Sequence, residues 1–307
     1  MMKIFKTLLD DSLKQLDELE TNIWVNMTNP TEEEIQSVCD KFSIHPDYIK
    51  AALDEEERSR IEIETNCTLI LVDVPIMVEN AYTTFPLGII LTNECMITVC
   101  IKELNLLNDF IYGKVKSFYT YKKTRFILQV LYKNATYYLQ YLKNINKMSS
   151  KIEKQLHKSL KNSELIQLLD LEKSLVYFST SLRGNDLVLE KMLKLDAIKK
   201  YPDDQDLLED VIIENKQAIE MAKIYSNILS GTMDAFASVI SNNLNIRMKF
   251  LTSVTILLTV PTMIASFFGM NLTLPLADNP FGFVIVIGIS LFISGLIAFL
   301  LIKKKMF

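Results

Sequence analysis

Residues 247–271 read RMKFLTSVTILLTVPTMIASFFGMN, and this stretch decides the fold of the chain. Its segment 250–268 is an uncharged run that is long enough to cross a hydrocarbon core of about 30 Å. A second uncharged run, residues 281–302, follows after a short loop. One such run could be a helix buried in the core of a soluble protein. Two in succession at one end of the chain instead favour a pair of transmembrane helices.

Basic residues flank the predicted spans on one side only. Arg247 and Lys249 precede the first span, and the linking loop of residues 269–280 contains no basic residue. Three lysines follow the second span, and these are Lys303, Lys304 and Lys305. By the positive-inside rule we expect both termini in the cytoplasm and the loop outside. The sequence therefore predicts a multi-pass protein of the cell membrane, in contact with the lipid bilayer.

The remainder of the chain has the composition of a soluble protein. The chain has 307 residues and a net charge of -4 at pH 7, which allows one large soluble domain besides the membrane segment. So small a charge, without a patch of interleaved arginines and aromatic side chains, argues against nucleic acid as a partner. The cysteines lack metal-site spacing, and Cys95 and Cys100 fall in an apolar run. We therefore expect buried thiols in a reducing compartment.

The first 120 residues alternate between β-rich and helical stretches, which predicts an α/β domain. A helix is expected to start near Asn29, with Pro30 in its first turn, and a second helix near His45 and Pro46. The last two expected strands form a hairpin around Asn93. The expected strands are residues 22–26, 60–64, 67–74, 85–92 and 94–101.

Helix dominates after residue 120. Residues 122–161 contain neither proline nor glycine, and a second helix is expected at 163–195. A third helix runs from the turn at Pro202 to Gly269, a length of about 97 Å at 1.5 Å per residue. We therefore predict an α+β membrane protein in which a very long stalk helix continues into the first span. Its expected parts are a cytosolic α/β domain with a helical hairpin (1–200), the stalk helix (201–249), a two-helix transmembrane region (250–302, with spans 250–268 and 281–302 and an outer loop 269–280) and a basic cytosolic tail (303–307).

Small and polar residues form a stripe along one face of the third helix. They recur at steps of three and four residues, the spacing of a heptad seam. Within a membrane, such a stripe fits either close packing between helices or the wall of a water-filled pore. We favour the pore, because the stripe continues from the cytosolic helix into the span. Two spans cannot enclose a channel, so a pore requires a homo-oligomer with this helix innermost. The members are Asp234, Ser238, Ser241, Asn245, Met248, Thr252, Thr255, Thr259, Thr262, Ser266 and Gly269.

The stripe carries no charge at membrane depth, which suits a hydrated cation. Mg²⁺ releases its water reluctantly, so hydroxyl, amide and carbonyl oxygens would bind its water shell rather than the ion itself. Met248 and Leu251, near the membrane entrance, would form an apolar ring that gates the pore by dewetting. Ordinary helix packing is the alternative for both residues.

Acidic residues gather near the start of the long helix. Acids in a first helical turn stabilise the helix dipole, but Asp210 and Glu214 lie beyond that turn. Repeated around a ring of subunits, their carboxylates would repel until a cation bridges them. We therefore expect a regulatory Mg²⁺ here that closes the channel. The cluster is Asp203, Asp204, Asp206, Glu209, Asp210 and Glu214.

The triplet Gly269-Met270-Asn271 ends the first predicted span. With the two-span ending, the long preceding helix and the terminal lysines, it resembles the signature of the CorA family of magnesium transporters. Asn242, Asn245 and residues 248–252 resemble the approach to the membrane in that family. Residues 54–62, followed by strands, resemble its cytosolic domain. The resemblance covers the whole chain, most firmly residues 203–305.

The resemblance implies a funnel-shaped homopentamer that takes up Mg²⁺. It implies a selectivity filter around hydrated Mg²⁺ formed by Gly269, Met270 and Asn271. It also implies gating by Met248 and Leu251. Regulatory Mg²⁺ is implied at interfaces between the cytosolic parts, with Asp210 and Glu214 on the stalk and Glu79 as a partner. With the stripe, the expected pore lining is Asp234, Asn245, Met248, Leu251, Thr255, Thr259, Thr262 and Ser266.

The outer loop departs from the family pattern. The family carries Met-Pro-Glu-Leu after the triplet, whereas residues 274–278 here are LPLAD, so an acidic outer ring rests on Asp278 alone. A relative that carries Zn²⁺, Co²⁺ or Ni²⁺ is therefore an alternative. The only histidines, His45 and His157, lie outside the stripe, which leaves soft metals without an obvious ligand at the filter.

A membrane-anchored coiled-coil scaffold or sensor is a remoter alternative, because it would explain the long helix but not its polar face within the span. The chain contains no phosphate loop, nucleophile elbow or His/Cys metal cluster. We therefore expect neither an enzyme nor an organic cofactor. Uptake would be driven by the membrane potential, which supplies about 4.6 kcal/mol per 100 mV for a divalent ion.

Overall fold

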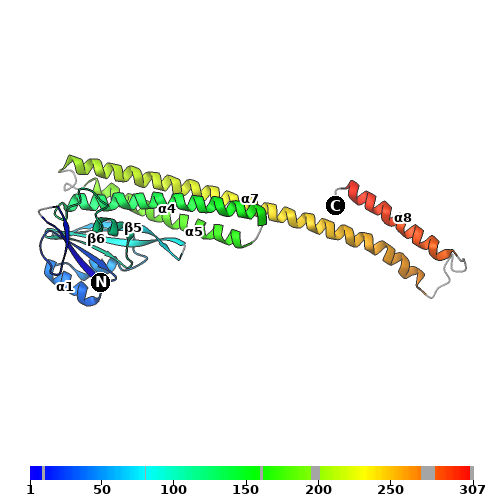
Figure 1. Ribbon diagram of the computed structural model, residues 1–307, viewed down its shortest axis with the longest axis horizontal. Coiled ribbons are helices and arrows are strands. Elements are labelled where there is room, and N and C mark those ends of the chain that lie inside the picture. The colour runs from blue at the N-terminus through cyan, green and yellow to red at the C-terminus, as the bar shows by residue number, and fades with distance from the viewer. Residues whose placement is uncertain (9–10, 80, 160–161, 195–200, 271–280, 305–307) are drawn as a thin grey trace. The chain divides into compact units, whose positions relative to one another are not determined.

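The computed structural model describes residues 1–8, 11–79, 81–159, 162–194, 201–270 and 281–304 of the chain (Figure 1). The chain forms two compact units, Met1–Gly231 and Thr232–Phe307. Helix α7 (Pro202–Phe268) contributes residues to both units. The predicted borders between cytosolic domain, stalk and membrane region stay predictions, because contacts within one chain do not define a membrane boundary.

Among the described residues, seven strands of the first unit form one sheet in the order β2-β1-β3-β7-β6-β5-β4. Neighbouring strands are antiparallel, except that β3 and β7 run parallel. The strands expected from the sequence are present, whereas β1 and β2 were not predicted. Their bounds are β1 Met2–Thr7, β2 Leu13–Leu16, β3 Ile23–Thr28, β4 Arg60–Ile63, β5 Cys67–Val78, β6 Ala81–Thr92 and β7 Cys95–Cys100.

Helices cover both faces of the sheet. Helices α1 (Glu32–Phe42) and α2 (Pro46–Ala51) pack on one face. Gly88 of β6 permits the close approach of α2, since a Cβ there would lie 2.5 Å from the Cβ of Ala52. Helices α3 (Asn105–Ile111), α4 (Lys123–Ser159) and α5 (Asn162–Met192) pack on the other face. Strand β7 is consequently buried along its whole length, as its continuous apolar run predicts.

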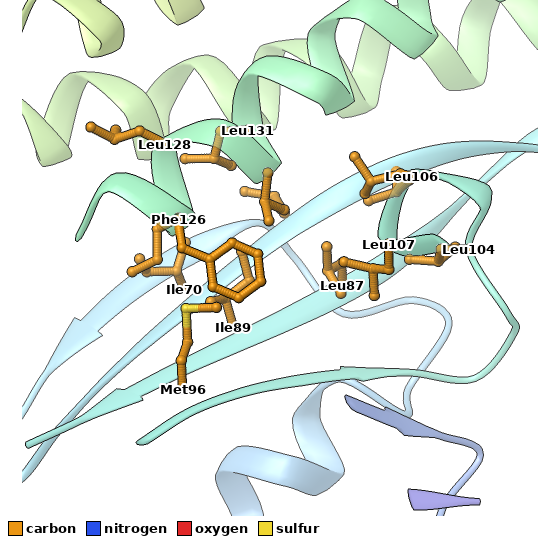
Figure 2. Packing of buried hydrophobic residues seen from close by; sticks show 14 of the residues in the cluster. Ile70, Leu87, Ile89, Met96, Leu104, Leu106, Leu107, Phe126, Leu128 and Leu131 are labelled. Atoms are coloured by element: carbon orange, nitrogen blue, oxygen red, sulfur yellow. The ribbon is translucent and has the colours of Figure 1, made fainter. Parts of the chain in front are cut away.

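The core on the second face joins the sheet to the long helices. Figure 2 shows Phe126, Leu128 and Leu131 of α4 packed over the sheet, with Leu106 and Leu107 of α3 beside them. Leu208 and Val211 of α7 belong to the same core. The start of α7 is therefore part of the folded first unit rather than a free linker.

Helix α1 begins later than the sequence predicted. The Thr31 hydroxyl accepts a hydrogen bond from the Glu34 backbone N–H at 3.2 Å, and the Glu34 carboxylate accepts one from the Thr31 N–H at 3.0 Å. This capping box satisfies N–H groups at the helix start. Asn29 and Pro30 therefore precede the helix, and the expectation that they form its cap and first turn was wrong.

Helices α4 and α5 are tied to the sheet through the backbone of Asp73. Strand β4 pairs with β5 up to Leu71 and stops short of Asp73. The Asn185 side chain of α5 takes the place of a strand: its Oδ1 accepts from the Asp73 N–H at 2.8 Å and its Nδ2 donates to the Asp73 carbonyl at 2.8 Å. Asn134 and Tyr138 of α4 donate to the same carbonyl at 2.9 and 3.1 Å.

The remaining expectations for the helices agree with the structure. Helices α4, α5 and α7 closely match the three predicted helices, and α8 (Gly282–Lys303) matches the second predicted span. Pro261 lies inside α7, as membrane helices tolerate. The predicted burial of the thiols is confirmed, because Cys39, Cys67, Cys95 and Cys100 are all free and buried.

Candidate functional site

The predicted stripe occupies an exposed face of α7 in the second unit. Its apolar member Met248 and the predicted gate residue Leu251 beside it expose 52% and 58% of their surface. A continuous exposed face with large apolar side chains indicates that another surface covers it in the working protein. All members of the stripe are exposed: Asp234, Ser238, Ser241, Asn245, Met248, Thr252, Thr255, Thr259, Thr262, Ser266 and Gly269.

The opposite face of α7 is turned toward α8. Pro261, Ile264 and Phe268 of α7 line a groove whose other wall contains Phe283 and Ile287 of α8. On an α-helix with 3.6 residues per turn, these α7 positions lie opposite the threonine stripe. Helix α8 therefore does not cover the stripe, which is left for contact with something outside the single chain.

The threonine hydroxyls of the stripe share one hydrogen-bonding geometry. Thr255 Oγ1 donates to the Leu251 carbonyl at 2.9 Å, and Thr259 Oγ1 donates to the Thr255 carbonyl at 2.7 Å. Thr262 Oγ1 donates to the Leu258 carbonyl at 2.8 Å. A hydroxyl has one proton and two lone pairs, so each threonine uses its proton within the helix and presents acceptor lone pairs outward. Such a row of acceptors fits the hydrogens of a cation's water shell.

Helices α7 and α8 have the properties of membrane spans. Within the described residues, these two helices are long and apolar enough to cross a bilayer. Only 6% and 11% of their most apolar windows are buried inside the structure. A core helix of a soluble protein would be mostly buried, so this alternative from the sequence is disfavoured.

The predicted filter begins at the last turn of α7. The Gly269 N–H donates to the carbonyl of Ala265 at 3.0 Å, and the Met270 N–H donates to the carbonyl of Phe267 at 3.3 Å. The helical turn thus extends through the first two residues of the triplet, and both are exposed. Asn271 and the loop residue Asp278 lie outside the described residues, so their roles stay predictions.

The acidic cluster at the start of α7 divides into different roles. Asp204 is buried, and its carboxylate accepts a hydrogen bond from Arg125 Nη1 at 3.4 Å. Burial raises the pKa of this carboxyl, against the lowering effect of Arg125. Asp204 thus joins the start of α7 to the start of α4. Sequence reasoning missed this pair, although Arg125 stands out as the one arginine between residues 61 and 182.

The predicted sensor residues are accessible or half-buried, and their role in metal binding stays a prediction. Asp210 is exposed, Glu214 is half-buried, and Glu79 is exposed at the turn that follows β5. In the part of the chain that the structure describes, no group of three or more His, Cys, Asp or Glu side chains is arranged to hold a metal.

The predicted basic ring lies at the end of α8. Lys303 is the last residue of the helix and Lys304 its C-cap, and both are exposed. Cations at this position interact favourably with the negative end of the helix dipole. Lys305 lies outside the described residues.

Comparison with known proteins places the chain in a family. The family described as CorA-like Mg²⁺ transporter protein matches residues 20–304. The cobalt/magnesium transport protein CorA of Methanocaldococcus jannaschii is 30% identical over 283 residues, which cover 88% of this chain and 87% of that protein. The protein of the same name from Thermotoga maritima is 23% identical over 322 residues, which cover 98% of this chain and 88% of that protein.

The solved structures agree. The complete structure of the CorA magnesium transporter from Methanocaldococcus jannaschii matches with a TM-score of 0.82 at 26% identity, covering 99% of this chain and 96% of that chain. The likeness covers the α/β domain, the long helix and the apolar C-terminal helices. The chain belongs to the CorA family.

Proposed function

We propose that the chain is one subunit of a magnesium channel that mediates Mg²⁺ uptake across the cell membrane. One observation carries the proposal: in a member of the CorA family, the first span presents an exposed, uncharged face of hydroxyl acceptors. Such a face holds a hydrated cation through its water without removing that water, as suits an ion that dehydrates reluctantly. The protein is a transporter and not an enzyme.

The driving force comes from the membrane potential. An inside-negative potential supplies about 4.6 kcal/mol per 100 mV for a divalent ion, so inward flow needs no nucleotide. The threonine oxygens accept hydrogen bonds from the water shell while the ion passes. Met248 and Leu251 form the apolar constriction that interrupts the water column when the pore is closed.

Identical copies of the chain together enclose the pore. The stripe faces away from α8, so only the same face on neighbouring subunits supplies the other walls, and we propose a homopentamer. Gly269, Met270 and Asn271 form the filter at the outer mouth, with Asp278 in the adjoining loop. Regulatory Mg²⁺ binds between cytosolic units and engages Asp210, Glu214 and Glu79. The remaining pore-lining positions are Asp234, Asn245, Thr255, Thr259, Thr262 and Ser266.

Co²⁺ is the second candidate ion, because the related protein of Methanocaldococcus jannaschii is named a cobalt/magnesium transport protein. The stripe itself offers oxygen acceptors. The cysteines are buried in the first unit, and His45 caps helix α2. Oxygen acceptors favour hard, hydrated ions over metals that bind imidazole or thiolate. We therefore place Mg²⁺ first.

Divalent flux into liposomes tests the function. Purified protein is reconstituted in vesicles, an inside-negative potassium diffusion potential is imposed, and uptake of Mg²⁺, Co²⁺, Ni²⁺ and Zn²⁺ is compared. We expect potential-dependent Mg²⁺ uptake that protein-free vesicles lack. No divalent uptake by correctly assembled protein would refute the channel, and faster Zn²⁺ than Mg²⁺ uptake would refute the ion assignment.

Thiol labelling tests the orientation, in which residues 1–249 and the C-terminus are cytoplasmic. A cysteine introduced at Ala277 should react with an impermeant thiol reagent added outside intact cells, and one introduced at Phe307 should not. The native cysteines are buried, which keeps the background low. The reverse labelling pattern would overturn the orientation.

A further inference from the structure

Helix α4 carries a lysine face that the transport mechanism does not use. Between residues 110 and 152 the sequence contains no Asp or Glu but nine Lys and Arg residues. Lys143, Lys147, Lys151 and Lys154 in the distal half of α4 are all exposed. Their steps of four, four and three residues place them on one side of the helix. We call these four residues the lysine face.

The lysine face differs from the basic residues at the start of the same helix. There, Lys123 Nζ donates to the Thr92 carbonyl at 3.1 Å and Lys133 pairs with Asp109 at 3.3 Å. Among the described residues, the lysine face forms no ion pair. Like charges four residues apart destabilise a helix, whereas solvated helix faces usually mix both signs. The face therefore indicates an anionic partner.

Contacts within the first unit show where this face lies. Helices α4 and α7 start side by side, at the Arg125–Asp204 bond. Asn134 of α4 and Asn185 of α5 meet at the Asp73 carbonyl. Further along α7, Asn215 bonds the Leu182 carbonyl of α5 at 3.2 Å. Helices α4 and α7 thus run in the same direction (Figure 1). The lysine face is at the end of the unit from which α7 continues toward the predicted span.

We propose that the lysine face docks on anionic lipid headgroups of the cytoplasmic leaflet beside the channel. The proposal rests on the cytoplasmic orientation proposed above. Clusters of lysines next to a membrane span are attracted by anionic lipids, and the attraction acts within a Debye length of about 8 Å. The lysine face lies at the end of the first unit where α7 leaves it, and its four lysines form no ion pair among the described residues; both features fit such a surface.

A second copy of the chain fits the lysine face less well. The acidic cluster of α7 lies at its start, level with Arg125 at the beginning of α4, whereas the lysine face occupies the other end of α4. In a ring of subunits with parallel stalks, the acidic cluster of a neighbour would stay at the same end as that of the first subunit. The two charged regions would therefore not meet.

A headgroup quencher tests the docking in the full-length protein. Ser150 is exposed among the lysines, and a Ser150→Cys variant carries a fluorescent probe. The protein is reconstituted in phosphatidylcholine vesicles with or without phosphatidylglycerol, each doped with a nitroxide-headgroup lipid. We expect about twofold or greater quenching with phosphatidylglycerol, and its loss in high salt, because the attraction is electrostatic.

Matched charge variants identify the residues responsible. Replacing Lys147, Lys151 and Lys154 together by Gln should reduce the quenching to the level in phosphatidylcholine alone. A control with the same charge change at Lys41, Lys191 and Lys194, which are exposed elsewhere, should keep it.

Three outcomes would overturn the proposal. These are equal quenching in both lipids, an equal loss in the control variant, or lipid-independent crosslinking of the position-150 cysteine to a neighbouring subunit. Mg²⁺ uptake by the same vesicles and labelling at position 277 report the channel and its orientation separately. A failure of docking is therefore distinguishable from a failure of the proposed function.

Discussion

Replacing Asn185 by Ala should weaken the attachment of the helical hairpin to the sheet. In the wild type, the Asn185 amide bonds both the N–H and the carbonyl of Asp73, at 2.8 Å each. The carbonyl keeps donors from Asn134 and Tyr138 in the variant. The Asp73 N–H loses the acceptor that stands in for a strand. We therefore expect the free energy of unfolding to fall, because this donor is left unpaired and the shortened side chain leaves a cavity.

The magnitude follows from these lost contacts. A buried donor left without a partner costs about 1–3 kcal/mol. Asn185 is only 3% exposed, so the shortened side chain also leaves a small cavity, and we expect about 2–3 kcal/mol in total. For a unit of this size, 1 kcal/mol corresponds to about 2–4 °C in Tm. The predicted decrease is therefore roughly 5–10 °C.

The only tryptophan of the chain gives a local assay. Trp24 is fully buried in the sheet core, so its fluorescence during heating reports the unfolding of the first unit. Glu190→Ala, an exposed change on the same helix, should stay within about 0.5 kcal/mol of wild type. If Asn185→Ala melts within about 2 °C of wild type, the amide does not replace a strand in the way the distances suggest.

Three further predictions concern conduction, sensing and pH. Asn271→Ala should assemble normally but lose Mg²⁺ flux by roughly tenfold or more, because a hydrogen bond toward a charged partner contributes about 1.5–3 kcal/mol; flux close to wild type would contradict the filter assignment. Asp210→Ala should lose the protection that Mg²⁺ gives the stalk against protease and should conduct at higher internal Mg²⁺; if protease protection and flux inhibition are unchanged in both Asp210→Ala and Glu214→Ala, the acids serve only the helix dipole and solubility. Burial raises the pKa of the Asp73 carboxyl, against hydrogen bonds from Ser181 and Ser59. The folded-state pKa lies above the unfolded value, so ionisation destabilises the fold as pH rises through the folded-state pKa. Asp73→Asn should therefore raise Tm near pH 8 and give no gain below about pH 4; an equal gain at both pH values would contradict a role for ionisation.

The helices could be read from the sequence because their signals are local. A stretch without proline or glycine gave α4, and a helical stretch interrupted only by Gly231 and Pro261 gave α7, each to within a few residues. The sheet order could not be read in this way. Strands β3 and β7 pair in parallel across about seventy residues of sequence, and no local pattern specifies such a partner. Strands β1 and β2 were missed because they are short and mix lysines with apolar residues, which weakens the apolar pattern.

The candidate site shows the same division between local and distant information. The spacing of Thr255, Thr259 and Thr262 already placed them on one face. The direction of their hydroxyl protons depends on the folded helix, and it turns a polar stripe into a row of acceptors. Conversely, the sequence grouped Asp204 with Asp210 because they are neighbours along the chain. Only the fold shows that the Asp204 carboxylate is bound by Arg125 of another helix.

A weak sensor on α7 is sufficient to control the pore if the site is repeated by symmetry. Shifting a two-state equilibrium from 1:99 to 99:1 requires about 5.5 kcal/mol of differential binding. At a Mg²⁺ concentration ten times its Kd, one site that binds only the closed state contributes about 1.4 kcal/mol. One such site would leave the pore poorly controlled, whereas five in the proposed pentamer give about 7 kcal/mol. Exposed carboxylates such as Asp210 are therefore adequate ligands, because five sites together supply the differential binding free energy that a single site lacks.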